Sequence, residues 1–171
     1  MNTFVALLRA INVTGTGKLA MKDLVALCED AGFKNPSTYI QSGNVVFQTK
    51  LAEDKAQQRL EKALATKMGK VHDVILRTAD QLDSVLKRVP FRKAPANRVH
   101  VLFMSEAPTK AEAAGITTPG KEEWKLLGRD LVVHYPDGQG ATKLKIPFAK
   151  RGTARNLNTI AKLRDMAREA E

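Results

Sequence analysis

The sequence has a single cysteine and no apolar run long enough to cross a membrane. Cys28 can form no disulfide within the chain, and a membrane-spanning helix would need about 20 consecutive apolar residues. The N-terminal stretch MNTFVALLRAIN has no basic region before its apolar run, and that run is only as long as a strand. We therefore expect no signal peptide. These absences predict a cytoplasmic protein without a membrane partner.

Motifs for metal binding and for the common catalytic chemistries are also missing. His72, His100 and His134 lie far apart, with no cysteine or carboxylate at the spacing of metal ligands. No G-x-S-x-G motif is present, and no pair of carboxylates stands out. The aromatic residues, one Trp, two Tyr and six Phe, form no strand of the RNA-recognition type. We predict no metal site and no cofactor, and the catalytic residues, if the protein has any, stay undefined.

Acidic residues are scarce in the second half of the chain. Residues 1–85 contain 11 Lys and Arg against 9 Asp and Glu, whereas residues 86–171 contain 17 against 9. From Gly138 to Arg164 there is no carboxylate. A field of this sign attracts nucleic acid or phosphorylated small molecules. The alternative is a basic surface that aids solubility and has no specific ligand.

The first half shows regular patterns of apolar residues. The predicted elements, in order, are a strand at Thr3–Ile11, a helix at Met21–Ala31, strands at Thr38–Gln41 and Val45–Thr49, a helix at Glu53–Met68 and a strand at His72–Leu76. Ser42, Gly43 and Asn44 are predicted to turn the hairpin, because glycine and asparagine tolerate positive φ.

The second half has nearly the same order of elements. Its predicted elements are a helix at Thr78–Val89, a strand at Arg98–Met104, a helix at Thr109–Ala114, a hairpin of Glu122–Leu127 with Asp130–Tyr135, and a helix at about Ala154–Ala170. The fold class we predict is α+β, with two ferredoxin-like (split βαβ) halves that have antiparallel sheets. The halves are residues 1–78 and a basic half, residues 79–171. Packing of the two halves as one compact unit is the alternative.

The stretch LLRAINVTGTGKLAMKDL has the order strand, Gly-rich loop, helix, which is typical of phosphate-binding proteins. It is no P-loop, because Asn12 stands where the first glycine belongs and Leu19 where the hydroxyl residue belongs. It is also a poor dinucleotide fingerprint, because the next strand has no acidic residue to bind a ribose. The free amides at the start of the helix, together with Arg9 and Lys18, favour an anion. A simple glycine turn is the alternative.

The segment GTARNLNTIAKL concentrates polar groups near the C-terminus. Thr153 is predicted to cap a helix, which would place Arg155, Asn158, Thr159 and Lys162 on one helical face. Such a set of donors would make an anion clamp. An ordinary solvated helix face explains the pattern as well.

The chain resembles members of the bacterial domain-of-unknown-function family 1697. The resemblance rests on four stretches that span most of the chain: ALLRAINVTGTGKLAMKDLVALCEDAGF, TYIQSGNVVF, GRDLVVHYPDG and TARNLNTIAKL. The first family motif reads R-G-I-N-V-G-G, so Arg9, Ile11, Asn12 and Val13 match it, whereas Ala10 and Thr14 replace glycines. The resemblance implies an α+β fold of two ferredoxin-like halves and no established activity.

The resemblance also groups the polar residues of the distinctive motifs into one candidate ligand site. With Lys18 from the loop, the predicted site residues are Arg9, Asn12, Lys18, Ser42, Asn44, Arg155, Asn156 and Asn158. The leading hypothesis is a non-enzymatic anion-binding protein whose partner is nucleic acid or a phosphorylated ligand. The alternatives are a small enzyme that acts on an anionic molecule between the halves, and a protein-interaction module. The sequence predicts neither the oligomeric state nor whether the basic stretches share a face.

Overall fold

The structure is a computed structural model that describes residues 1–12, 18–40 and 43–171. The chain forms two compact units. The first unit comprises Met1–Leu82 and Lys162–Glu171, and the second comprises Asp83–Ala161. The sequence predicts a boundary between residues 78 and 79, whereas the structure divides the chain after Leu82. The last ten residues, Lys162–Glu171, belong to the first unit.

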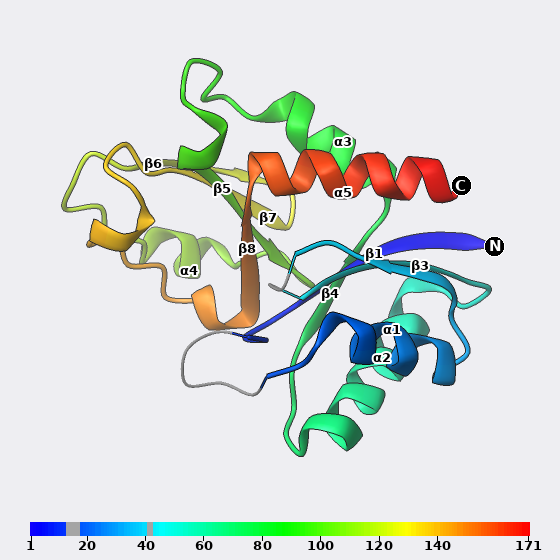
Figure 1. Ribbon diagram of the computed structural model, residues 1–171. Coiled ribbons are helices and arrows are strands. Elements are labelled where there is room, and N and C mark those ends of the chain that lie inside the picture. Colours follow the sequence, from blue (N-terminus) through cyan, green and yellow to red (C-terminus); the bar gives the residue numbers. More distant parts are fainter. Residues whose placement is uncertain (13–17, 41–42) are drawn as a thin grey trace. The chain divides into compact units, whose positions relative to one another are not determined.

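The first unit contains a four-stranded antiparallel sheet. Its strands are β1 (Asn2–Leu8), β2 (Lys34–Thr38), β3 (Asn44–Thr49) and β4 (Val74–Arg77), in the order β2-β3-β1-β4. Helices α1 (Met21–Asp30) and α2 (Glu53–Met68) cover one face of this sheet (Figure 1). Each helix connects two strands, as the sequence patterns predict.

The core of the first unit follows from alternation along the strands and helical spacing along the helices. Phe4 and Leu8 of β1 point to the helices and pack in one cluster with Leu24, Leu60 and Leu64. The pattern in α2 predicts both of its ends, because good helix formers fill Glu53–Met68. Cys28 belongs to the same core and is fully buried. Burial raises the pKa of its thiol to about 12, so the thiol is inert at neutral pH.

The strand before the first hairpin differs from the prediction. β2 spans Lys34–Thr38, earlier than the predicted Thr38–Gln41. It contains Pro36, and its pairing with β3 is irregular between Lys34 and Ser37. Proline and an irregular register are found on edge strands, where no further strand needs the missing amide. The predicted turn at Ser42 lies outside the described residues.

The second unit contains another four-stranded antiparallel sheet. Its strands are β5 (Val99–Met104), β6 (Glu123–Leu127), β7 (Asp130–His134) and β8 (Gly152–Asn156), in the order β6-β7-β5-β8. If the strands of each unit are counted from its own first strand, both sheets have the order 2-3-1-4. The α+β class, with an antiparallel sheet in each half, is confirmed.

The connections in the second unit are shorter than those in the first. α4 (Lys110–Ala114) lies between β5 and β6, whereas the 3₁₀ turns η2 (Gln139–Ala141) and η3 (Ala149–Arg151) lie between β7 and β8. α3 (Ala79–Arg88) and the 3₁₀ turn η1 (Ala96–Arg98) precede β5, and α5 (Leu157–Ala170) follows β8. Both α3 and α5 extend across the division between the units.

β8 replaces the beginning of the predicted C-terminal helix. Thr153 pairs with Phe103 and Arg155 pairs with Val101, so both are strand residues of the second sheet. The prediction that Thr153 caps a helix is therefore wrong, as is the helical face that would include Arg155. Pairing with β5, which is distant in sequence, overrides the local helical pattern.

The last part of α5 belongs to the first unit through side-chain contacts. Gln48 Nε2 of β3 donates to the Ala170 carbonyl oxygen at 2.7 Å, and Arg168 Nη2 lies 2.7 Å from Asp80 Oδ1. Leu163 and Ala167 are buried. Within the described ranges, no helix combines the length and the apolar character that crossing a membrane requires.

Candidate functional site

Arg9 follows the last residue of β1, at one end of the first sheet. Three segments meet there: the segment after β1, the β2–β3 turn and the loop before β4. The Leu8 amide donates to the Gly43 carbonyl at 2.9 Å, and the Arg9 amide donates to the Asp73 carbonyl at 2.9 Å. Gly43 has φ +81°, and a Cβ there would lie 3.0 Å from Leu8 Cβ. Only glycine fits this approach without strain. The segment after β1 is thus held between the β2–β3 turn and the loop before β4.

His72 is a member of this cluster that the sequence motifs did not indicate. Its Nδ1 lies 3.2 Å from the Arg9 carbonyl oxygen, and the residue is only 4% exposed. A carbonyl oxygen can only accept, so we assign the proton to Nδ1. Nε2 then carries a lone pair, and it has no hydrogen-bond partner among the residues that the structure describes. Because His72 and Arg9 are far apart in sequence, no spacing rule could have paired them.

Asn12 closes the loop that follows Arg9. Its Nδ2 donates to the Leu19 carbonyl, and its Oδ1 accepts from the Leu19 amide, both at 2.8 Å. Asn12 has φ +58°, a conformation that asparagine tolerates better than most residues. Its carboxamide therefore holds the two ends of the loop together. Lys18, next to Leu19, is exposed to solvent.

Asn44 has a similar structural role in the hairpin. It is fully buried, and its Nδ2 donates to the Tyr39 carbonyl at 3.1 Å. The Tyr39 amide in turn donates to the Asn44 carbonyl at 3.2 Å. Ser42, the other predicted site residue of this turn, lies outside the described residues.

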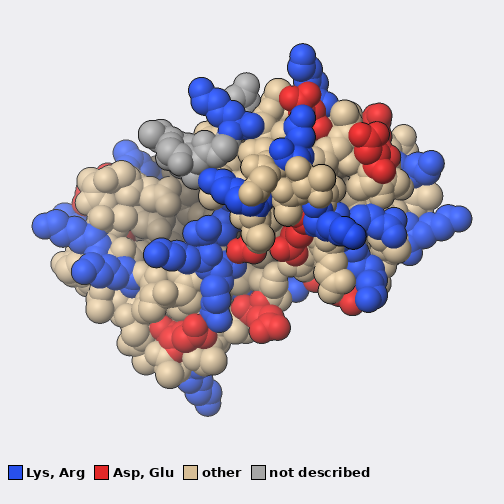
Figure 2. Space-filling view, turned by 90° about the horizontal axis from the view of Figure 1, so that it is seen from below, with Lys and Arg blue, Asp and Glu red and all other residues tan. Residues whose placement is uncertain are grey.

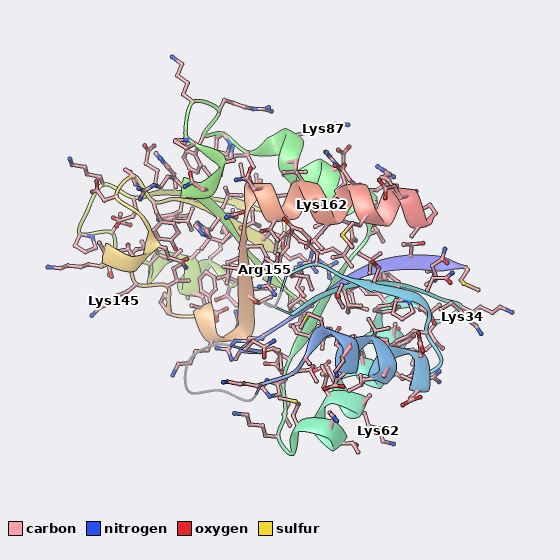
Figure 3. All side chains as sticks on the ribbon, viewed as in Figure 1. Lys34, Lys62, Lys87, Lys145, Arg155 and Lys162 are labelled. Atoms are coloured by element: carbon pink, nitrogen blue, oxygen red, sulfur yellow. The ribbon has the colours of Figure 1, made fainter. Side chains whose placement is uncertain are left out.

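Arg155 is buried in the second sheet and does not lie on a helix surface. Its Nη1 donates to Thr153 Oγ1 at 2.6 Å and to the Ala154 carbonyl at 2.9 Å. Burial lowers the pKa of its guanidinium to about 10, because a buried site disfavours the charged form. The group still carries its charge at neutral pH. Figure 3 shows Arg155 among packed side chains, whereas Lys145 points outward from the second unit.

Asn156 and Asn158 stand at the beginning of α5. Asn156 Oδ1 accepts from the Thr159 amide at 3.0 Å, which is the usual geometry of a helix N-cap. Asn158 is exposed in the first turn. Asn156 thus takes the role that the sequence pattern had given to Thr153.

The predicted site residues therefore form two local groups. Arg9, Asn12, Lys18 and Asn44 belong to the first unit, and Arg155, Asn156 and Asn158 belong to the second. A single site composed of both groups stays a prediction. Within each group, asparagine side chains that the motifs offered as ligand contacts bond to the backbone of the protein itself.

Positive charge is concentrated in the second unit. Asp83–Ala161 contains 14 Lys and Arg against 7 Asp and Glu, a net charge of +7. The rest of the chain contains 14 against 11, a net charge of +3. Lys and Arg side chains project from much of the face shown in Figure 2, while Asp and Glu form small separate groups. Two cations of the second unit form partly exposed ion pairs, Lys87 with Asp83 and Arg151 with Glu112.

Metal ligands do not gather within the described ranges. No group of three or more His, Cys, Asp or Glu side chains is placed there so as to hold an ion. His100 instead packs edge-on against Tyr135, with ring centroids 5.4 Å apart. Burial lowers the pKa of its imidazole.

The fold defines an α+β protein whose two halves each contain a four-stranded antiparallel sheet. The family described as "Protein of unknown function (DUF1697)" matches residues 1–131, so the chain belongs to this family. The match covers Arg9, Asn12, Lys18, Ser42 and Asn44, and it ends before β8. No curated protein matches the chain.

The chain is also similar to a solved structure, "The structure of conserved bacterial protein SP0830 from Streptococcus pneumoniae". The TM-score is 0.80 at 21% sequence identity, and the similarity covers 96% of this chain and 98% of that chain. At this identity the comparison supports the fold alone.

Proposed function

We propose that this protein is a non-enzymatic, cytoplasmic anion-binding protein that binds phosphate groups of nucleic acid or of a phosphorylated ligand through its second unit. The observation that carries the proposal is the net charge of +7 in Asp83–Ala161. Exposed cationic side chains attract polyanions by long-range steering, and their binding releases counterions from the polyanion.

The ion pair between Lys87 and Asp83 is too weak to prevent the lysine from binding a phosphate. Lys87 Nζ lies 2.8 Å from Asp83 Oδ2, but the lysine side chain is 75% exposed. Exposed pairs contribute about 0–1 kcal/mol, so a phosphate can compete for such a lysine at little cost. Arg88 and Lys93 are also exposed. The charges of Arg88 and Lys93 add to the positive field of the second unit.

The test is a titration of fluorescently labelled single-stranded DNA, double-stranded DNA and RNA at several salt concentrations. We expect log affinity to fall linearly with log salt, with a slope of about 0.7–0.9 per phosphate contact. Affinities weaker than about 0.1 mM at low salt for all three polymers would refute the nucleic-acid form of the proposal.

A matched pair of variants locates the binding surface. Arg88→Gln/Lys93→Gln removes two exposed charges from the second unit, and Lys62→Gln/Lys67→Gln removes two from α2 of the first unit. We expect the first variant to weaken binding and to reduce the salt slope by about 1–2, and the second to have a smaller effect. Equal losses in both variants would remove the second unit from the proposal.

A further inference from the structure

The second unit contains a hollow of about 650 Å³ that none of the sequence motifs indicated. It is lined by Thr117, Thr118 and Pro119 on one side and by Lys143 and Lys145 on the other. Its volume lies within the range of about 300–1,000 Å³ that is typical of small-molecule sites. The first stretch precedes β6, and the second lies between β7 and β8.

Hydrogen bonds hold the two sides of the hollow in place. The Thr117 amide donates to the Lys145 carbonyl and the Lys145 amide donates to the Thr117 carbonyl, both at 3.0 Å. Beyond this pair, Thr142 Oγ1 donates to Glu122 Oε1 at 2.6 Å. The hollow is therefore already formed without a ligand, which lowers the entropy cost of binding.

Alternating burial directs both lysines to the same side of their segment. Thr142, Leu144 and Ile146 are half-buried, and Leu144 and Ile146 pack against a cluster of buried apolar side chains in the second unit. Lys143 and Lys145, which alternate with them, are exposed. Residues two apart in an extended segment face the same way, so both ammonium groups can reach one ligand.

The chemistry of the lining favours a doubly charged anion. Two ammonium groups and two threonine hydroxyls provide donors, and the lining has no carboxylate among the residues described. The carboxylate of Glu122, which is not part of the lining, accepts from Thr142 Oγ1, and this hydrogen bond is the main reason why the pKa of Glu122 is lowered. Gly120 lies against the same Glu122 carboxylate, because a Cβ at Gly120 would be 2.6 Å from Glu122 Oε2.

A hollow of similar size in the first unit provides a contrast. It has a volume of about 640 Å³ between α1 and α2, and charges of both signs line it. Asp23 and Asp30 stand on α1, opposite Arg59, Lys62 and Lys67 on α2. Such a lining does not select an anion, whereas the lining of the second hollow does.

We propose that the hollow between Thr117–Pro119 and Lys143–Lys145 binds the terminal phosphate of a phosphomonoester. The inference rests on the proposed anion-binding function and assigns it a specific site. A terminal phosphate carries more charge than a phosphodiester, and it can accept from both lysines and from a threonine hydroxyl of the lining. The phosphate can belong to a small metabolite or to the end of a nucleic acid chain.

The experiment is an NMR titration of the ¹⁵N-labelled full chain with four probes: inorganic phosphate, ribose 5-phosphate, a short oligonucleotide with a 5′-phosphate, and the same oligonucleotide with a 5′-hydroxyl. We expect saturable shifts of the amides of residues 117–118 and 143–145. In Lys143→Gln/Lys145→Gln, affinity for the bound phosphomonoester should fall about tenfold or more. The control Lys110→Gln/Lys125→Gln removes the same charge from exposed positions outside the hollow and should retain most of the affinity.

The probes distinguish the sources of the phosphate. Saturation by ribose 5-phosphate supports a small ligand, and a preference of about tenfold or more for the 5′-phosphate over the 5′-hydroxyl oligonucleotide supports a chain end. If the control and the double variant lose equal affinity, or if the shifts map elsewhere, the inference is overturned. Salt-dependent binding of both oligonucleotides without these shifts would overturn the inference and leave the proposed function standing, and no binding of any probe would end both.

Discussion

Ala10 has a backbone conformation that residues other than glycine rarely adopt, with φ +57°. It follows Arg9, in the segment held between two loops, and it stands where the family motif has glycine. A Cβ in this region costs about 1–2 kcal/mol. We expect Ala10→Gly to raise the free energy of unfolding by about 0.5–1 kcal/mol, after the greater freedom of glycine in the unfolded chain is subtracted. Urea denaturation measures this change.

The control for this prediction is Ala31→Gly. Ala31 ends α1 with φ −76°, a conformation in which glycine gives no relief of strain. This substitution should therefore lower the free energy of unfolding by about 0.5–1 kcal/mol. Equal effects of the two substitutions would show that the backbone conformation of Ala10 has no energetic cost.

Gly152 allows β8 to approach β5 closely. A Cβ at this position would lie 2.5 Å from the Phe103 carbonyl oxygen and 2.9 Å from Met104 Cγ. The backbone oxygen cannot turn away as a flexible side chain could. Gly152→Ala should therefore lower the free energy of unfolding by about 1–3 kcal/mol, as overpacking usually does. Gly140→Ala, where nothing lies within 4 Å of the added carbon, should stay within about 0.5 kcal/mol of wild type in the same urea experiment.

The asparagines show what the sequence can and cannot reveal about the candidate site. Asn12, Asn44 and Asn156 all belong to distinctive motifs, and all three bond to backbone groups of the protein. The motifs indicate correctly that these positions are special. The motifs cannot distinguish an asparagine that contacts a ligand from one that bonds to the backbone of a loop. The bond between Asn12 and Leu19, for example, depends on how the fold places Leu19. Asn12, Asn44 and Asn156 have structural roles independent of any ligand.

The beginning of α5 depends on Asn156. Its side chain accepts from the Thr159 amide at 3.0 Å, and loss of such a cap costs about 0.5–2 kcal/mol. We expect Asn156→Ala to lower the free energy of unfolding by this amount in thermal or urea denaturation. Asn158→Ala, at an exposed position of the same turn, should have an effect smaller than about 0.5 kcal/mol. The reverse order of the two effects would contradict the assignment of the cap.

Strong local patterns predict elements, and long-range pairing changes them. α2 follows its sequence pattern from Glu53 to Met68 because the helix needs only its own periodicity. The sequence does not predict β8, because Arg155 and Asn156 are polar and fit the helical pattern of α5 if it is extended toward its N-terminus. They form a strand only because β5 offers a partner. The sequence does not predict β2 either, since Asn35 and Pro36 are typical of turns.

The residues Lys162–Glu171 stabilise the first unit. Leu163 is 1% exposed and Ala167 is 0% exposed, and both belong to the part of α5 that is assigned to this unit. We expect deletion of Lys162–Glu171 to cost more than about 3 kcal/mol or to prevent folding, because buried apolar surface is lost. Leu163→Ala is the milder variant and should cost about 2–5 kcal/mol, measured by urea denaturation.

Glu169→Ala serves as the control, because Glu169 is exposed on the same helix. It should change the free energy of unfolding by less than about 0.5 kcal/mol. A truncated chain that is as stable as the wild type would show that the last ten residues add nothing to the first unit.

The two segments of the first unit, which enclose the second unit in sequence, impose an order on synthesis. A ribosome makes residues 1–82 before the second unit and residues 162–171 after it, and domains generally fold as their residues emerge. The first sheet can form early, but Gln48 and Asp80 must wait for Ala170 and Arg168. The second unit, whose residues are contiguous, can fold during that wait. The first unit therefore begins to fold before the second unit and is completed after it.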